Sequence, residues 1–149
     1  MRGIRGNQAF KMISCIILTH ADLGFGLKNA LEGIMGTQEG LSVLSNTGLG
    51  REEMISALQK KINEENYEDG LVIFVDMPGT SWWQTAKKVA YGISADPNLT
   101  PATRPKIAVV TGVNLPMLVK FFNLRTSLPI SQLVPLIKLE GEKGIIAES

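Results

Sequence analysis

Short apolar runs alternate with longer amphipathic segments along most of the chain. The runs are rich in β-branched residues and end at polar positions, which is typical of strands buried on both faces of a parallel sheet. They cover Ile13–Thr19, Leu41–Leu44, Leu71–Val75 and Lys106–Thr111. Between them, apolar residues recur every three or four positions, the period of a helix. The pattern predicts a doubly wound α/β domain with four parallel strands in the order 2-1-3-4 and helices on both faces.

Residues that favour helix starts precede several of the amphipathic segments. Asp22, Ser81 and Asn114 stand where an N-cap is expected. The helix that follows Asp22 is predicted to turn a set of apolar residues toward the core: Leu23, Leu27, Ala30, Leu31 and Ile34. Their spacing of three and four residues places them on one face of that helix.

The end of the chain predicts one more helix and one more strand. Ser131–Glu140 continues the helical period, and Gly141 and Gly144 then bracket the short segment Ile145–Ala147. An isolated strand of this length needs a partner. We therefore expect it to be either an edge strand of the same sheet or a strand exchanged with another subunit.

Composition excludes several classes of protein. The 149 residues, 44% hydrophobic and 19% charged, suit one compact soluble domain. With 15 Lys and Arg against 14 Asp and Glu, the net charge of +1 argues against binding to nucleic acid or to an anionic membrane surface. A single cysteine, Cys15, and a single histidine, His20, form no disulfide and no zinc cluster. We expect no metal and no cofactor.

The apolar runs are too short for a spanning helix, which needs about 20 residues. The reduced cysteine and the lack of a cleavage site after Met12–Leu18 predict a cytoplasmic protein. Residues 1–11 carry no apolar period and precede a second methionine. We interpret them as a disordered N-terminal extension, with the functional domain over residues 12–149.

Polar residues follow three of the predicted strands, at the edge where open parallel sheets bind ligands. His20 follows the first strand, Asp76 the third, and 111–114 the fourth. A partly exposed imidazole is a nucleophile that can be phosphorylated, and a carboxylate bonded to one ring nitrogen leaves the other nitrogen free. The turn Gly79-Thr80-Ser81 opens a helix, whose main-chain N–H groups can receive phosphoryl oxygens.

Simpler interpretations exist for each of these residues. His20 can be an ordinary exposed histidine, Asp76 a surface carboxylate, and Ser81 a plain N-cap. Trp82 and Trp83 are adjacent on a helix and cannot both face the core. One of them is expected near the rim, as loose packing or as a contact for a partner.

Three segments nevertheless resemble one known family. They are Ile-Leu-Thr-His-Ala at 17–21, Phe-Val-Asp-Met-Pro-Gly-Thr-Ser at 74–81 and Gly-Val-Asn-Leu-Pro-Met-Leu at 112–118. Together they are similar to the enzyme IIA domain of the mannose-family bacterial sugar phosphotransferase system, over about residues 12–147. The third segment is the most specific of the three.

The resemblance implies a function. In that family the histidine matching His20 accepts a phosphoryl group from the phosphocarrier HPr and passes it to an enzyme IIB domain, which would here be a separate protein. The aspartate matching Asp76 hydrogen-bonds that histidine, and the position of Ser81 lies beside the phosphoryl group. The family is typically a homodimer that exchanges its final strand, and it meets the membrane only through transporter subunits, which set sugar specificity.

This chain departs from the family pattern around the histidine. Ala21 stands where glycine is common, Pro78-Gly79-Thr80 replaces the usual double glycine, and Asp22 adds a negative charge nearby. A cradle with fewer glycines is stiffer.

Other functions are compatible with the same pattern. An orphan IIA-like regulator would use the phosphorylated histidine to control partner binding. A receiver domain would instead phosphorylate Asp76 with a divalent metal, but it needs more carboxylates after the first strand. A flavodoxin-like binding module is disfavoured because no Gly-rich fingerprint follows that strand.

Overall fold

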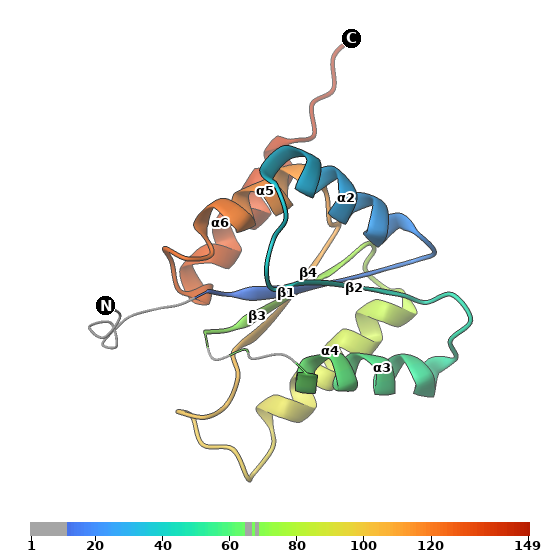
Figure 1. Cartoon of the computed structure of the whole chain (residues 1–149), viewed down its shortest axis with the longest axis vertical. Helices are drawn as coiled ribbons and strands as arrows, with labels where there is room; N and C mark the ends of the chain where they lie inside the picture. The colour runs from blue at the N-terminus through green and yellow to red at the C-terminus, as the bar shows by residue number, and fades with distance from the viewer. Residues whose placement is uncertain (1–11, 65–66, 68) are drawn as a thin grey trace.

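The computed structural model describes residues 12–64, 67 and 69–149, so the predicted extension over 1–11 lies outside the described residues. Four strands form the sheet: β1 (Ser14–Thr19), β2 (Leu41–Ser45), β3 (Leu71–Val75) and β4 (Ile107–Thr111). All neighbours pair in parallel, in the order β2-β1-β3-β4 (Figure 1). The predicted fold class and strand order are confirmed.

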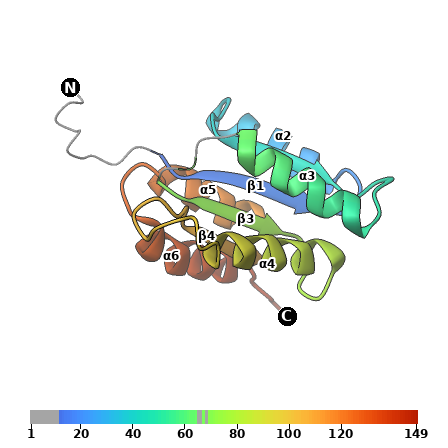
Figure 2. The same cartoon turned by 90° about the horizontal axis from the view of Figure 1, so that it is seen from below.

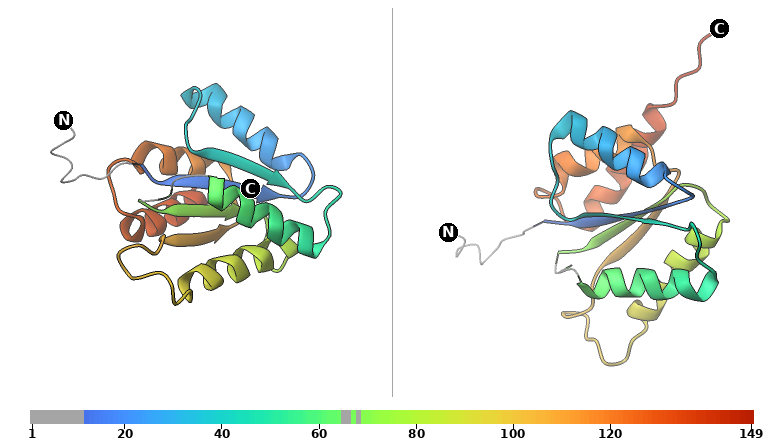
Figure 3. Two further views of the ribbon diagram at one scale, coloured as in Figure 1. Left: turned by 60° about the horizontal axis from the view of Figure 1, so that its bottom comes forward. Right: turned by 45° about the vertical axis from the view of Figure 1, so that its right-hand side comes forward.

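Helices cover both faces of this sheet. On one face lie α2 (Leu23–Met35), α5 (Leu115–Leu124) and α6 (Ile130–Lys143), and on the other lie α3 (Arg51–Glu64) and α4 (Ser81–Ser94). Figure 1 shows the three layers from the side, as does the right-hand view of Figure 3, and Figure 2 shows the sheet from the face that α3 and α4 cover. In the part of the chain that the structure describes, no helix combines the length and the apolar character needed to cross a bilayer.

The two central strands hold the core together. Every residue of β1 and β3 is buried, because helices pack on both of their faces. Cys15, Ile17 and Phe74 point toward the face covered by α2, α5 and α6, where Phe74 meets the Phe121 ring edge to face at 5.5 Å. Alternate residues such as Leu18 point toward α3 and α4.

Cys15 lies within this core, and we expect its thiol to be inert. Complete burial raises its pKa, and the nearby Arg125 guanidinium lowers it by a smaller amount. Because the thiolate is the reactive form, a thiol reagent at pH 8 should leave the folded protein unmodified and label the single cysteine after denaturation. Rapid labelling of the folded protein would show that β1 opens far more easily than its burial indicates.

The inward face predicted for α2 is partly wrong. Leu31 is buried, but Leu23 and Ile34 are 50% and 62% exposed. The cause is Gly24, where a Cβ atom would come within 2.7 Å of the Val43 side chain. Because the backbone of α2 comes this close to the sheet at Gly24, the helix faces the sheet with Gly24 and Leu31. Leu23 and Ile34 consequently lie at the margin of the packed face.

The predicted final strand is not formed within the described chain. After α6, residues 145–149 have no regular structure, and Ile145 and Ile146 are exposed. The segment extends away from the body of the protein (Figure 1). An edge strand made by the same chain is thus absent from the described fold, whereas exchange with a second subunit stays a prediction.

Candidate functional site

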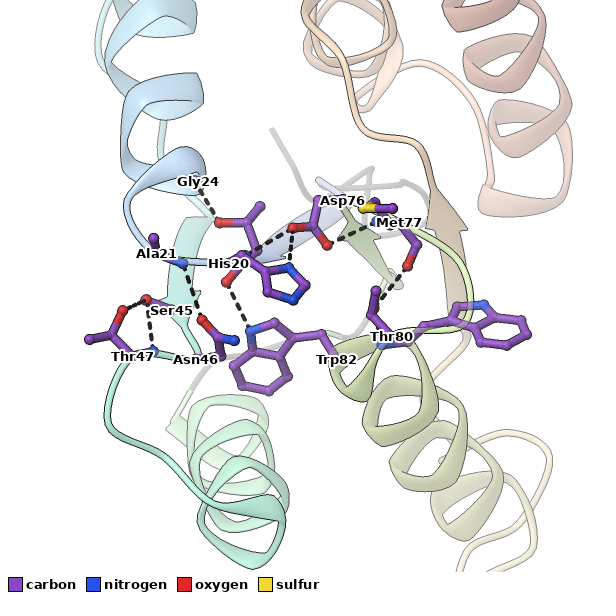
Figure 4. A network of polar contacts seen from close by, with 12 residues as sticks. His20, Ala21, Gly24, Ser45, Asn46, Thr47, Asp76, Met77, Thr80 and Trp82 are labelled. Carbon is purple, nitrogen blue, oxygen red and sulfur yellow. Dashed lines mark hydrogen bonds and ion pairs between the residues drawn. The ribbon is translucent and has the colours of Figure 1, made fainter.

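The carboxyl ends of β1 and β3 bring His20 and Asp76 together. These strands are neighbours, so the residues that follow them meet at the same edge of the sheet. Nδ1 of His20 donates a hydrogen bond to Oδ2 of Asp76 at 2.8 Å. The main-chain N–H of His20 donates to the same oxygen at 2.9 Å (Figure 4). The pairing expected from the sequence is present in the structure.

Asp76 is held in one orientation. Its side chain is only 7% exposed, and its second oxygen, Oδ1, accepts a hydrogen bond from the N–H of Met77 at 2.8 Å. Because an ionised carboxylate only accepts hydrogen bonds, the short contact requires a proton on Nδ1 of His20. Nε2 therefore carries the lone pair.

His20 presents that lone pair outward. Its side chain is 52% exposed, although its main chain is bonded to Asp76. A ring that is oriented on one side and open on the other suits a nucleophile rather than a core histidine. The site can therefore attack an electrophile that approaches from solvent.

The turn after Asp76 leads from the carboxylate that binds His20 into α4. Gly79 adopts a positive φ of 81°, and no heavy atom outside the turn lies within 4 Å of where its Cβ would be. Gly79 and Ser81 are exposed, and the helix that follows is 14 residues long. The turn thus has open space above it and the positive end of a helix below it.

The N-cap of α4 is Thr80, not Ser81 as predicted. Thr80 has the extended backbone of a cap, and its hydroxyl accepts a hydrogen bond from the N–H of Trp83 at 3.4 Å. The same hydroxyl donates to the carbonyl of Met77 at 2.9 Å. Thr80 can therefore reach the third residue ahead, which leaves Ser81 as the first helical residue with an exposed side chain.

Asn46 belongs to the site, although the sequence analysis did not select it. It follows β2, the other neighbour of β1, and its Oδ1 accepts a hydrogen bond from the N–H of Ala21 at 3.1 Å (Figure 4). Ala21 has φ of 47°, in the left-handed region. The predicted strand order already places the end of β2 at this edge of the sheet. The polar residue directly after β2 is therefore the sequence feature that points to Asn46.

Ala21→Gly is expected to stabilise the protein by about 0.5–1 kcal/mol. An L-residue in the left-handed region costs about 1–2 kcal/mol, and the greater freedom of glycine in the unfolded chain offsets about 0.5–1 kcal/mol of that relief. Urea unfolding measures the change as a higher midpoint with an unchanged slope. A lower midpoint would mean that the left-handed turn is not strained.

The residues after β4 connect that strand to α5, and the N–H of Val113 donates to the carbonyl of Val75 at 3.2 Å. Asn114 caps α5 by accepting from the N–H of Met117 at 3.0 Å, and its amide donates to the carbonyl of Gly141 at 3.2 Å. Gly112 supplies the positive φ of 73° that the connection needs. The segment at 112–118 therefore leads from β4 into α5, and Asn114 also holds it to α6.

Comparison with known proteins gives the family. Residues 14–138 match the family described as EIIA-man, the PTS system fructose IIA component, where PTS is the phosphotransferase system. The chain belongs to this family. It is thus a PTS IIA component, a class with a general phosphotransferase role.

Solved structures agree with this family and fold. Component EIIA from Streptococcus agalactiae has 25% identity and a TM-score of 0.77, with 91% of this chain and 97% of that chain covered. The mannose/sorbose specific IIA subunit from Enterococcus faecalis has 14% identity and a TM-score of 0.71, with 93% and 96% covered. A sigma-54 interaction domain protein from Enterococcus faecalis has 12% identity and a TM-score of 0.71, with 91% and 95% covered. The sequence matches none of the curated proteins.

The receiver-domain interpretation finds no support at Asp76. Both oxygens of this carboxylate already accept hydrogen bonds, from His20 and from Met77. Among the described residues, no group of three or more His, Cys, Asp and Glu side chains is placed to hold a metal ion. The arrangement is instead that of a carboxylate that orients an imidazole.

Proposed function

We propose that this IIA component is a phosphocarrier that takes a phosphoryl group onto Nε2 of His20. The observation that carries the proposal is the 2.8 Å bond from Nδ1 of His20 to the almost fully buried Asp76, which leaves Nε2 as the free nitrogen. Family membership supports the same reaction class.

The transfer needs no proton to move during the attack. Nε2 attacks phosphorus in line with the leaving nitrogen, so the new N–P bond forms as the old one breaks. When the donor is a phosphohistidine protonated on its other nitrogen, the donor ring leaves as neutral imidazole with the bonding electron pair. The His20 ring becomes an imidazolium that keeps its Nδ1 proton, and the Asp76 carboxylate stabilises that positive charge.

The Gly79-Thr80-Ser81 turn is the proposed site for the phosphoryl oxygens. Main-chain N–H groups at the start of α4, the dipole of that helix and the exposed Ser81 hydroxyl favour a group with negative charge. The Thr80 hydroxyl is already used within the turn, so its contribution comes from its main-chain N–H.

The partners follow from the family. HPr is the proposed donor and a separate enzyme IIB protein the proposed acceptor. We also propose a homodimer in which the extended segment with exposed Ile145 and Ile146 adds to the sheet of a second copy. The edge strand β4 is only half-buried along its length and offers unpaired backbone groups for such an addition.

A regulatory role is the second candidate function, and the comparison of folds gives one reason to test it. The fold is shared with a protein named for a sigma-54 interaction domain, so the fold alone does not separate a carrier from a regulator. In a regulator, phosphorylated His20 would change the binding of a partner instead of passing the group on.

Onward transfer separates the two roles. The protein is incubated with phosphoenolpyruvate, enzyme I and HPr, freed of these components, and then mixed with purified mannose-family enzyme IIB protein. A carrier gains one acid-labile phosphoryl group and loses it to the IIB protein within seconds. Stable retention of the group would favour the regulator, and no gain at all would contradict both roles.

A further inference from the structure

Trp82 links α4 to the strand that carries His20. The main packing partners of α4 are α3, β4 and β3 rather than the histidine strand β1. The side chain of Trp82 is nevertheless only 1% exposed and belongs to the same buried cluster as Leu18 of β1. Its Nε1–H donates a hydrogen bond to the carbonyl of Thr19 at 3.1 Å (Figure 4). Thr19 is the residue directly before His20.

Thr19 is hydrogen-bonded to two further parts of the fold besides α4. Its carbonyl also accepts a hydrogen bond from the N–H of Asn46 at 3.3 Å. The Thr19 hydroxyl accepts one from the N–H of Gly24, in α2, at 2.7 Å. A buried indole N–H needs an acceptor, but nothing about packing the ring requires that acceptor to be the peptide before the nucleophile.

The segment between Asp76 and Trp82 is consequently anchored at both ends to the same short stretch of β1. At its start, Asp76 holds the ring and the main-chain N–H of His20. At its end, Trp82 holds the Thr19 carbonyl. Between the anchors lies the exposed turn at 79–81, which contains a glycine with positive φ and has open space above it.

We infer that Trp82 is a positioning residue for phosphoryl transfer: its indole N–H sets the place of the 79–81 turn relative to Nε2 of His20. The inference rests on the proposed function, because it concerns the same site. Asp76 orients the nucleophile, whereas Trp82 orients the groups that receive the phosphoryl oxygens. Loss of the Trp82 N–H therefore slows transfer while His20 stays the acceptor.

Trp82→Phe tests this directly. Phenylalanine keeps a buried aromatic ring and removes the N–H, and the Thr19 carbonyl retains its bond from Asn46, so the variant is expected to fold. The expected effect is a fall of about 10-fold in the rate constant for phosphorylation, because a misplacement of about 1 Å can cost up to about 100-fold. The KM for phospho-HPr should not change, since the buried ring touches no partner.

Trp83→Phe is the matched control. Trp83 is the next residue of the same helix, but its ring lies under the ammonium group of Lys87 at 3.6 Å. With a small-molecule phosphoryl donor, which needs no contact with the Trp83 ring, the variant is expected to be phosphorylated at the rate of the unmodified protein. Circular dichroism of all three proteins at the assay temperature establishes that each is folded, so that a slower rate is not an effect of unfolding.

The use of two phosphoryl donors separates a failure of this inference from a failure of the proposed function. Besides phospho-HPr, potassium phosphoramidate is used, since it needs no protein contact: its P–N bond breaks as the Nε2–P bond forms, and ammonia leaves with the bonding pair. If phospho-HPr fails but phosphoramidate labels His20, the proposed donor is wrong and Trp82→Phe is compared with phosphoramidate alone. If neither donor labels His20, the proposed function is wrong, and the inference falls with it.

A spectroscopic measurement on the unmodified protein provides a second test that does not depend on the variant's folding. The two tryptophans give two indole N–H signals in a nitrogen-15 spectrum, and the control variant assigns them. Phosphorylation should move the Trp82 signal and leave the Trp83 signal in place. A Trp82→Phe protein that transfers at full rate, or a Trp82 signal that ignores phosphorylation, would overturn the inference while leaving the proposed function intact.

Discussion

His20→Ala is expected to accept no acid-labile phosphate from phospho-HPr. The sequence contains a single histidine, so this substitution removes every imidazole from the protein. The side chain is half exposed, but its loss removes the hydrogen bond to Asp76, which keeps only the main-chain N–H of His20 as a donor to Oδ2, so the free energy of unfolding should fall by about 1 kcal/mol. Intact mass after reaction with phosphoenolpyruvate, enzyme I and HPr measures the labelling.

The controls for this experiment are internal. A phosphohistidine is lost in acid, whereas a phosphoserine or phosphothreonine survives. Unchanged circular dichroism and a single cooperative urea transition show that the variant is folded. Acid-labile label that persists in His20→Ala would place the phosphoryl group on another residue, with Asp76 as the first to test, and would contradict the assignment of the acceptor.

Asp76→Ala is expected to slow phosphorylation by about 10²- to 10³-fold without abolishing it. Without the carboxylate, the His20 ring loses its orientation, the proton is no longer held on Nδ1, and the imidazolium formed by transfer loses its counter-charge. The N–H groups of His20 and Met77 also lose their acceptor, so stability should fall by about 1–3 kcal/mol.

Asp76→Asn separates these effects. An amide of the same shape keeps one acceptor oxygen, which can serve either His20 or the N–H of Met77 but not both, so only part of the stability should return; the amide also carries no charge to balance the imidazolium. Rates are measured in a single turnover with phospho-HPr in excess. Asp76→Asn should remain at least about 10-fold slower than the unmodified protein. A full rate in Asp76→Asn would show that the carboxylate acts on structure alone.

The sheet and the central pair of the site could be predicted because they depend on short-range rules. Runs such as Leu71–Val75 are apolar throughout, as expected for a short strand that is covered on both faces. Parallel strands also place their carboxyl ends at the same edge of the sheet. Once β1 and β3 are neighbours, His20 and Asp76 must lie close together. The family resemblance identified the same two residues independently.

The features that the sequence did not predict depend on how the helices roll and how closely they approach the sheet. Gly24 brings α2 down onto Val43, which turns Leu23 out of the core. The roll of α4 decides that Trp82 faces inward and finds the Thr19 carbonyl. The choice of Thr80 over Ser81 as N-cap depends on which hydroxyl reaches the N–H of Trp83. Spacing along the chain does not determine any of these contacts.

The nitrogen that carries the phosphoryl group tests the central claim most directly. Protein labelled with nitrogen-15 at His20 is phosphorylated through phosphoenolpyruvate, enzyme I and HPr, and its imidazole resonances are recorded at a pH where the N–P bond survives. The structure predicts phosphorus coupling to Nε2 and a proton retained on Nδ1, because Asp76 binds Nδ1 at 2.8 Å. Coupling to Nδ1, or a phosphorylated protein whose imidazole resonances do not move, would contradict the account.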